Sequence, residues 1–215
     1  MSGCDLLVFG ASQNTGLLVA TLAAKRGEKV AAMVRTGSDA SVLESIGATI
    51  IRGDAFNLDD CFRTVETSVP RRVISLMGGK NQNGRRICAI GNIHVTEALL
   101  SYSALERFLL VTSMGCGEQY AGTSDKVKQF LGEALRAKTR AEDYLKSTAL
   151  PWTIVRPGGL TNEPATGQYF LSENPDRIHK GYLSRGDVAQ AIVDVLNDPQ
   201  WLNKAVSVQN AEKGE

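Results

Sequence analysis

The stretch Leu6 to Val19, LLVFGASQNTGLLV, constrains the fold more than any other part of this sequence. A short apolar run ends at Gly10, a polar turn follows, and a second apolar run begins after Gly16. This order is typical of a buried strand that passes through a glycine turn into a helix. We expect Gly10 to form the tight turn and Gly16 to let the helix pack closely on the strand.

The same turn indicates what the start of the helix binds. The first N–H groups of a helix have no partner within it, and in dinucleotide-binding folds they face a pyrophosphate. The middle glycine of the usual three is absent, since Gln13 stands there, so we expect polar side chains to hydrogen-bond to the phosphates. These side chains belong to Ser12, Gln13, Asn14 and Thr15. The pattern predicts a dinucleotide site rather than a purely structural turn.

Strand and helix signals then alternate along the chain. Six apolar strands are predicted, at residues 6–10, 29–35, 49–54, 71–79, 107–117 and 152–159. Helices are predicted between them, at residues 15–26, 38–48, 57–66, 85–104 and 126–147. Nearly continuous apolar strands are typical of a parallel sheet covered on both faces.

The last quarter of the chain breaks this alternation. Residues 160–184 are polar and rich in Gly, Pro and Asn, and a helix at 185–199 and a strand at 205–210 follow. We expect one doubly wound, Rossmann-like α/β domain over residues 1–215. In this domain, residues 160–185 form loops over a ligand crevice at the carboxyl ends of the strands.

The end of the second strand indicates which dinucleotide is bound. An acidic residue there would bind a ribose 2′-hydroxyl, but the chain reads Met33, Val34, Arg35, Thr36. Arg35 offers a planar fork suited to a 2′-phosphate, and Ser38 is placed to help. The alternative is that Arg35 is a solvated residue at a strand end. The predicted cofactor is NADP(H).

Composition excludes several other classes of protein. The 215 residues carry a net charge of +1 without a long basic run, so we expect neither nucleic acid nor a membrane as partner. Four cysteines without a C-x-x-C pair and two histidines, His94 and His179, predict no metal site. Each histidine is expected to be an ordinary surface or capping residue. The first strand begins too early for a leader, and nothing demands a partner chain, so we expect a cytoplasmic monomer.

Four motifs resemble one known family. GASQNTG (10–16), RGD (52–54), VTSMG (111–115) and AKTRAEDYLKSTALPWTIVRPGGL (137–160) are similar to atypical short-chain dehydrogenases/reductases of the NAD(P)H-binding, NmrA-like group. The short length and VISLMGG (73–79) are most similar to the biliverdin and flavin reductases of that group. The late block is equally similar to small plant NADP-binding proteins of the superfamily. The resemblance covers nearly the whole chain.

The resemblance implies roles for residues that follow the strands. Asp54 would lie near the adenine, and Leu76, Met77 and Gly78 would line the ribose and pyrophosphate side. The residues that would flank the nicotinamide are Thr112, Ser113, Pro157, Gly158, Gly159 and Leu160. The plain alternatives are that Asp54 caps a turn and that Gly158 and Gly159 let a loop bend.

The usual acid of short-chain dehydrogenases is missing from the sequence. That acid is a Tyr whose pKa is lowered by a Lys four residues later. The residues four positions after the five tyrosines are Glu106, Ser124, Thr148, Glu173 and Gly186. Lys138 best aligns with the family's Lys, and Ala134 stands four residues before it. An ordinary carbonyl–alcohol dehydrogenase, sugar epimerase or dehydratase is therefore disfavoured.

Other residues are candidates for contacts with the reacting groups. Ser113 could orient the nicotinamide or substrate, or satisfy local backbone. Lys138 shares a helix face with Glu142 and could touch the nicotinamide ribose or the substrate, or form a solvated ion pair. Two groups of residues are candidates for substrate binding. Arg85 and Arg86 could attract an anion or be a solvated helix start. Tyr120, Tyr169 and Phe170 lie in long loops and could form an apolar wall.

Two functions follow from these observations. An electron-poor acceptor can take a hydride while its proton comes from solvent, so the protein need supply only orientation and desolvation. The first prediction is an NADPH-dependent reductase of a planar conjugated acceptor, such as a flavin, a linear tetrapyrrole like biliverdin, or a quinone. The second is a non-catalytic NADP(H) sensor or assembly factor, which would lack the same acid.

Overall fold

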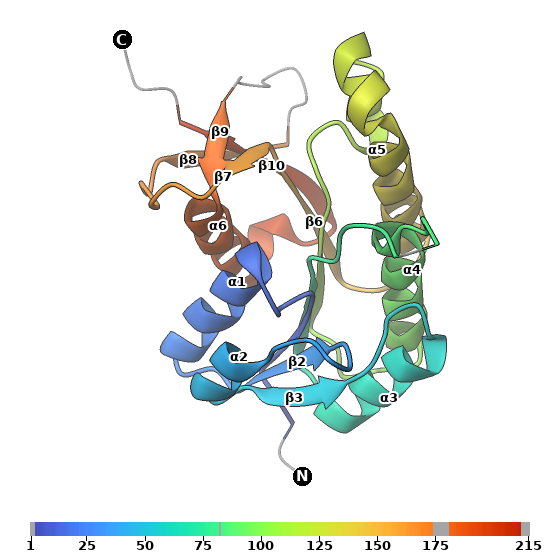
Figure 1. Ribbon diagram of the computed structural model, residues 1–215, viewed down its shortest axis with the longest axis vertical. Helices are drawn as coiled ribbons and strands as arrows, with labels where there is room; N and C mark the ends of the chain where they lie inside the picture. Colours follow the sequence, from blue (N-terminus) through green and yellow to red (C-terminus); the bar gives the residue numbers. More distant parts are fainter. Residues whose placement is uncertain (1–2, 82, 174–180, 212–215) are drawn as a thin grey trace.

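The chain forms an eight-stranded sheet with helices on both faces, seen in a computed structural model that describes residues 3–81, 83–173 and 181–211 (Figure 1). The sheet order is β3-β2-β1-β4-β5-β6-β10-β8. Seven strands run parallel: β1 (Leu6–Phe9), β2 (Val30–Val34), β3 (Thr49–Arg52), β4 (Arg72–Ser75), β5 (Arg107–Val111), β6 (Trp152–Pro157) and β10 (Lys204–Asn210). The edge strand β8 (Tyr169–Ser172) is antiparallel to β10. The predicted doubly wound parallel sheet is confirmed.

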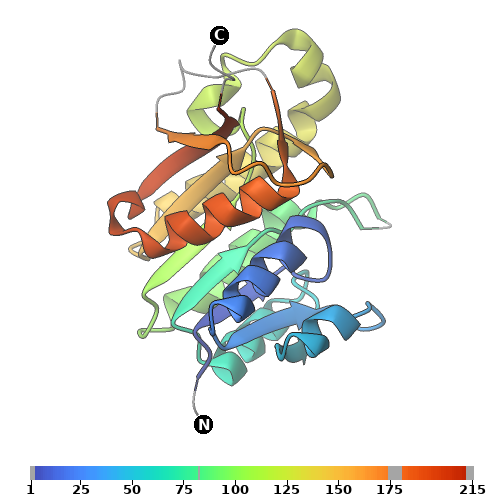
Figure 2. The same cartoon turned by 90° about the vertical axis from the view of Figure 1, so that its left-hand side faces the viewer.

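Two sets of helices cover the sheet. Their bounds are α1 (Asn14–Lys25), α2 (Ser41–Ser45), α3 (Leu58–Ser68), α4 (Ile87–Leu100), α5 (Asp125–Lys146) and α6 (Arg185–Asn197), with short 3-10 turns η1 (Gly117–Tyr120) and η2 (Pro199–Trp201). Helices α1 and α6 pack together on one face, while α3, α4 and α5 pack in a row on the other (Figures 1 and 2). In this described part of the chain, no helix is both long and apolar enough to cross a membrane.

Alternate side chains of each central strand build the two core layers. Leu6 and Val8 of β1 face the layer with α1 and α6, while Leu7 and Phe9 face the layer with α3, α4 and α5. All four are fully buried, as a parallel strand covered on both sides requires. The apolar runs of the sequence therefore reflect burial on both faces.

The sheet reverses its order between β1 and β4. The chain moves outward from β1 to β2 and β3 and then returns to the other side of β1 with β4. The connections that leave β1 and β4 diverge onto opposite faces of the sheet, so a crevice opens at the carboxyl ends of these two strands.

The segment expected to form only loops contains three short strands. β7 (Gly159–Thr161) pairs in parallel with β9 (Tyr182–Ser184), and β8 joins the main sheet. One carboxylate fastens this region to the start of α6, because Asp187 accepts the N–H groups of Thr166 and Gly167 at 2.9 and 2.7 Å. Burial alone would raise the pKa of Asp187, but these hydrogen bonds hold it below its usual value. His179 lies outside the described residues.

Candidate functional site

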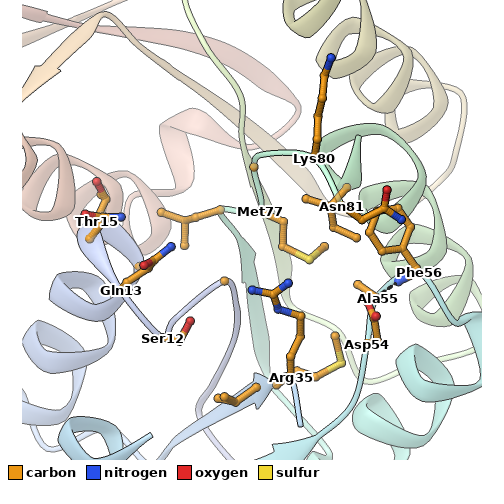
Figure 3. Close-up of a pocket in the computed structure, with 18 of the residues that line it drawn as sticks. Ser12, Gln13, Thr15, Arg35, Asp54, Ala55, Phe56, Met77, Lys80 and Asn81 are labelled. Carbon is orange, nitrogen blue, oxygen red and sulfur yellow. Dashed lines mark hydrogen bonds between the residues drawn. The ribbon is translucent and has the colours of Figure 1, made fainter. Parts of the chain in front are cut away.

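A cavity of about 560 Å³ lies at the reversal point, beyond the ends of β1, β2 and β4 (Figure 3). The sequence-predicted residues that line it are Gly10, Ser12, Gln13, Asn14, Thr15, Gly16, Arg35, Asp54, Leu76, Met77, Gly78 and Leu160. The sequence analysis missed a second set, namely Met33, Val34, Gly53, Ala55, Phe56, Lys80, Asn81, Ile87 and Arg185. Residues that follow four different strands thus meet in one place.

The two glycines of the first turn are required by close contacts. Gly10 has a φ of +86°, and a Cβ there would lie 3.1 Å from the carbonyl carbon of Leu76. A Cβ on Gly16 would lie 2.1 Å from the carbonyl oxygen of Gly10. No side chain fits at Gly16 without moving helix and strand apart, so the close packing that the pattern predicts is present.

The position of the missing glycine does not need one. Gln13 has φ −159° and ψ 170°, an extended backbone that any residue adopts. The left-handed conformation falls instead on Asn14, with a φ of +52°, and Asn tolerates it better than most residues. Gln13 therefore replaces glycine without backbone strain.

The start of α1 differs from the starts of three other helices. Asn57 caps α3, Ser124 caps α5 and Ser184 caps α6, each through its side chain. Helix α1 has neither a side-chain cap nor an acidic residue in its first turn. Its first N–H groups and the positive end of its dipole therefore face the cavity, where an anion would satisfy both.

Arg35 and Asp54 lie at the outer end of the cavity. The side chain of Arg35 extends between Gln13 and Met77 (Figure 3), and it forms no hydrogen bond or ion pair within the residues that the structure describes. Asp54 accepts the Phe56 N–H at 3.0 Å and so caps a turn, and it also lines the cavity, where its place near the adenine stays a prediction. Ser38 does not line the cavity; its N–H instead closes a turn on the carbonyl of Arg35 at 3.0 Å.

The loop after β4 reaches from the cavity to α5. Lys80 Nζ lies 2.9 Å and Arg86 Nε 2.8 Å from Glu133, and these two cations lower the pKa of Glu133 to about 2, Arg86 contributing most. The guanidinium of Arg85 lies 5.3 Å from the ring centre of Phe56. Arg86 thus stands at the start of α4 and pairs with Glu133 of α5, while its contact with a substrate anion stays a prediction.

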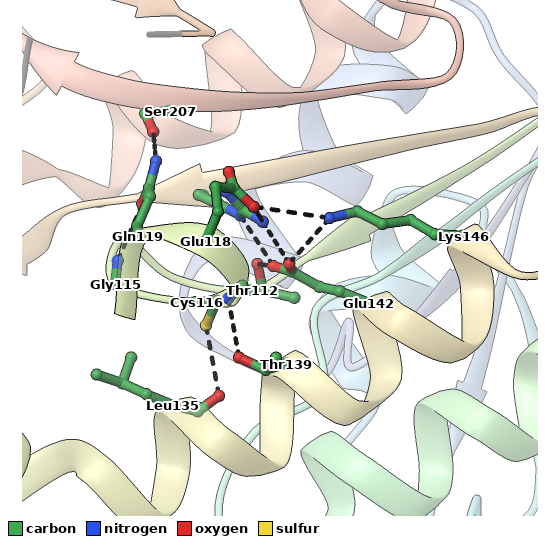
Figure 4. A network of polar contacts seen from close by, with 12 residues as sticks. Thr112, Gly115, Cys116, Glu118, Gln119, Leu135, Thr139, Glu142, Lys146 and Ser207 are labelled. Atoms are coloured by element: carbon green, nitrogen blue, oxygen red, sulfur yellow. Dashed lines mark hydrogen bonds and ion pairs between the residues drawn. The ribbon is translucent and has the colours of Figure 1, made fainter. Parts of the chain in front are cut away.

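The carboxyl ends of β5 and β6 hold an internal polar network (Figure 4). Arg156 is 1% exposed and Glu142 0% exposed, and Nε of Arg156 donates to Oε1 of Glu142 at 3.0 Å. Thr112 donates its hydroxyl to the same carboxylate at 2.5 Å, and Glu118 accepts from Arg156 on the other side. The Thr112 hydroxyl therefore faces α5, and the expected place of Thr112 beside the nicotinamide stays a prediction.

Lys138 belongs to this region as well. Its Nζ donates to the Thr112 carbonyl at 2.7 Å, and burial lowers its pKa. The interpretation of Lys138 and Glu142 as a solvated ion pair is wrong, since Glu142 is fully buried against Arg156. Ser113 is half-buried, and its hydroxyl forms no hydrogen bond within the described part of the chain.

The remaining candidates for the nicotinamide side lie next to Ser113. The Gly158 N–H donates to the Val208 carbonyl, and the Met114 N–H donates to the Pro157 carbonyl. Gly159 begins β7, where the ring of Tyr182 lies so close that a Cβ on Gly159 would be 2.8 Å from it. Of the residues 157–160, only Leu160 lines the cavity. Tyr182, 70% exposed, is a neighbour of this region that the sequence analysis missed.

The expected apolar wall is not assembled. Tyr169 and Phe170 lie in β8 rather than in a loop, and Tyr169 packs on the core layer of α1 and α6 and donates to Asp194 at 2.8 Å. Tyr120 lies in η1, where its hydroxyl accepts from Arg136 at 2.7 Å. None of these three lines the cavity.

Three of the five tyrosines have a raised pKa, the opposite of the lowered pKa expected of a catalytic tyrosine. Burial and the hydrogen bond to Asp194 raise the pKa of Tyr169 to about 12. The hydrogen bond to Glu97 raises the pKa of Tyr144, and burial raises that of Tyr102. The described residues contain no cluster of His, Cys, Asp and Glu that could hold a metal ion. His94 bonds through Nδ1 to the Ala55 carbonyl at 2.9 Å.

Known proteins resemble this chain over nearly its whole length. ChuY, an anaerobilin reductase from Escherichia coli O157:H7, is 28% identical with a TM-score of 0.86, over 98% of this chain and 99% of that one. An uncharacterised chloroplastic protein of Arabidopsis thaliana is 28% identical over 94% of this chain and 75% of its own length. Sanguinarine reductase of Eschscholzia californica is 34% identical, but over only 39% of this chain and 32% of its own length.

A family match identifies the cofactor class. The NAD(P)H-binding family matches residues 10–199, which include the glycine turn, Arg35 and Asp54. The predicted nicotinamide dinucleotide is thereby confirmed, whereas the cytoplasmic location stays a prediction because one relative is chloroplastic. The chain belongs to the NAD(P)H-binding family, among the atypical short-chain dehydrogenases/reductases, and has the fold of an NAD(P)H-dependent reductase.

Proposed function

We propose that this protein is an NADPH-dependent reductase that transfers hydride to a planar conjugated acceptor, namely a flavin, a linear tetrapyrrole such as biliverdin, or a quinone. One observation carries the proposal: none of the five tyrosines lines the cofactor cavity, and the pKa values of Tyr102, Tyr144 and Tyr169 are raised. Acceptors that need no protein acid at the moment of hydride transfer are the class that such a site can serve.

The cavity fits a dinucleotide. The uncapped start of α1 would hold the pyrophosphate, and Gly10 and Gly16 let the main chain approach it. Asp54 and Phe56 would contact the adenosine half. Arg35, with no partner of its own in the described residues, supports a cofactor that carries a 2′-phosphate.

The rest of the site would orient the reactants. The bound dinucleotide supplies the hydride. Ser113, whose hydroxyl is uncommitted, would bind the carboxamide of the nicotinamide or an oxygen of the acceptor. Lys138 holds the Thr112 carbonyl and so fixes the main chain at Ser113, while Leu160 would exclude water from one side. The proton that completes the reduction would come from solvent.

The relatives support the acceptor class. ChuY is named an anaerobilin reductase and another relative a sanguinarine reductase. Both names denote reduction of a conjugated molecule by a chain that shares this fold or part of its sequence. We expect a monomer, because nothing in the sequence demands a partner chain, and sedimentation would test this.

The decisive experiment follows NADPH oxidation at saturating cofactor with FMN, biliverdin or a small quinone as acceptor. We expect reduction of at least one of them well above the uncatalysed rate. Tight NADPH binding without reduction of any acceptor would contradict the reductase and favour the NADP(H) sensor. The Arg35→Ala variant tests the cofactor preference separately, with NADPH binding weakened and NADH binding nearly unchanged.

A further inference from the structure

A second hollow, of about 510 Å³, lies beside the cofactor cavity at the carboxyl ends of β2 and β3. The two share Arg35, Gly53 and Asp54. The residues that complete its lining are Thr36, Arg52, Asp60 and Arg63. Three guanidinium groups thus surround one space that opens next to the outer end of the cofactor cavity.

Arg52 holds the turn that carries Arg35. Its Nη1 donates to the carbonyl oxygens of Ser38 at 2.8 Å and of Arg35 at 3.2 Å. The Ser38 N–H closes the same turn on the Arg35 carbonyl at 3.0 Å, and Gly37 has a φ of +82°. The main chain at Arg35 is therefore fixed by a side chain from the neighbouring strand.

The charges of the hollow are not balanced. Arg63 forms an ion pair with Asp60, whose other oxygen accepts the Asp54 N–H at 2.8 Å. Neither Arg35 nor Arg52 forms an ion pair in the described ranges, and the Nε and Nη2 groups of Arg52 have no hydrogen-bond acceptor there. Arg35 and Arg52 therefore keep unused donors and Arg63 is neutralised within the protein, so the three arginines that line the hollow outnumber its two carboxylates, Asp54 and Asp60.

We propose that Arg52 is a specificity-determining residue for the phosphorylated dinucleotide. It fixes the Arg35–Ser38 turn with one nitrogen and offers its remaining donors to the same 2′-phosphate that Arg35 binds. A guanidinium serves both tasks because its N–H groups point in several fixed directions in one plane, which an ammonium group does not provide. The inference rests on the proposed preference for NADPH and adds a second residue to it.

The test uses two adenosine probes that differ in the 2′-phosphate, adenosine 2′,5′-bisphosphate and adenosine 5′-monophosphate, together with NADPH and NADH. Calorimetric titration of Arg52→Gln should show roughly tenfold weaker binding of the bisphosphate and of NADPH, as expected for one charge-assisted hydrogen bond. Binding of the monophosphate and of NADH should change less than about twofold. Arg52→Lys should recover part of the loss, since it restores the charge alone.

Arg63→Gln is the matched control. Arg63 lines the same hollow, but its charge is already paired with Asp60, so its loss should leave the ratio of the two affinities unchanged. Equal weakening of both probes by Arg52→Gln, or a selectivity loss no larger than that of Arg63→Gln, would overturn the assignment of Arg52. The thermal unfolding midpoint of each variant identifies any loss that comes from misfolding.

Arg35→Ala separates failure of this inference from failure of the proposed function. If Arg35→Ala loses NADPH selectively and Arg52→Gln does not, the cofactor preference stands and the role of Arg52 is refuted. If neither variant is selective, the proposed preference for NADPH fails and the role of Arg52 fails with it.

Discussion

The carboxyl ends of β1 and β4 and those of β5 and β6 lie along one edge of the sheet, yet their polar groups are satisfied differently. Near β1 and β4, the first N–H groups of α1 have no side-chain cap, and the side chain of Arg35, which follows the neighbouring strand β2, has no partner in the described residues. At β5 and β6, Thr112, Glu142 and Arg156 bond to one another. We therefore expect ligand groups among those polar side chains at strand ends that keep donors or acceptors unused inside the protein.

The largest effect is expected from breaking the internal network. Glu142→Gln keeps the shape of the side chain but leaves the buried charge of Arg156 with Glu118 as its only acidic partner among the residues described. The free energy of unfolding should fall by about 3–5 kcal/mol, as for other buried pairs that lose one member. Urea unfolding measures this change.

The matched variant for that experiment is Glu118→Gln, because Glu118 binds the same arginine from an exposed position. Its effect should be about 1 kcal/mol or less. The affinity of the folded Glu142→Gln protein for NADPH should be unchanged. Equal destabilisation by the two variants would mean that the network is not organised around Glu142.

A smaller loss of stability, with a large loss of binding, is expected when the β1–α1 turn is forced apart. The Cβ of a Gly16→Ala variant would collide with the Gly10 carbonyl, which should cost about 1–3 kcal/mol of stability. Displacement of α1 should weaken NADPH binding by roughly tenfold or more, the equivalent of one lost charge-assisted contact. Gly122→Ala, at an open position outside the cavity, is the control. Unchanged cofactor affinity in Gly16→Ala would refute the role given to the turn.

Two neighbouring residues sharpen the comparison. Ser113→Ala should lower kcat with the acceptor by roughly two- to tenfold, as for one hydrogen bond, and leave stability unchanged. Thr112→Val should do the reverse, lowering stability by about 1–3 kcal/mol because a buried carboxylate loses a donor. Steady-state kinetics and urea unfolding of both variants test these two expectations. A Ser113→Ala enzyme with full activity would remove Ser113 from the site.

The smallest effect concerns Glu133, which joins the loop after β4 to α5. Its pKa is lowered from 4.5 to about 2 by Arg86 and Lys80, so the stabilisation is fully present above pH 4.5 and is lost as the pH falls towards 2. The stability difference between the wild type and Glu133→Gln should therefore be constant from pH 5 to pH 7 and shrink between pH 4.5 and pH 2. A difference that grows on acidification would contradict this assignment.

Most of the fold was predictable because its signals are local. Strands such as Leu6–Phe9 are apolar on both faces, and Gly10 and Gly16 mark the turn that the backbone geometry requires. The position of Arg35 was predictable for the same reason, because the carboxyl end of the second strand lies beside that turn in this type of fold. The strands and the glycine turn, which depended on local sequence spacing, agree with the structure, whereas Ser38 closes a turn and does not line the cavity.

The expectations that failed depended on contacts between distant segments. Lys138 and Glu142 share a helix face as predicted, but Glu142 bonds to Arg156, whose place beside α5 follows only from the sheet order. Tyr169 was assigned to a loop because its neighbours in the sequence are polar. One of these neighbours, Thr166, binds Asp187 through its N–H, and Tyr169 itself begins the antiparallel edge strand.

Some of the missed residues carried a readable signal. Lys80 directly follows the two glycines after the fourth strand, and Arg52 ends the third strand in the same way as Arg35 ends the second.

The extended backbone at Gln13 has a consequence for how such proteins are recognised. Main-chain amides would hold the expected anion, so the residue at position 13 can vary as long as the path of the chain is kept, whereas the left-handed φ at position 14 favours Asn or Gly. A motif search that requires glycine at the central position would not find this chain. The site is defined by its main-chain conformation. The amino-acid sequence reflects that conformation most directly at Gly10 and Gly16, where a Cβ atom would meet the main chain.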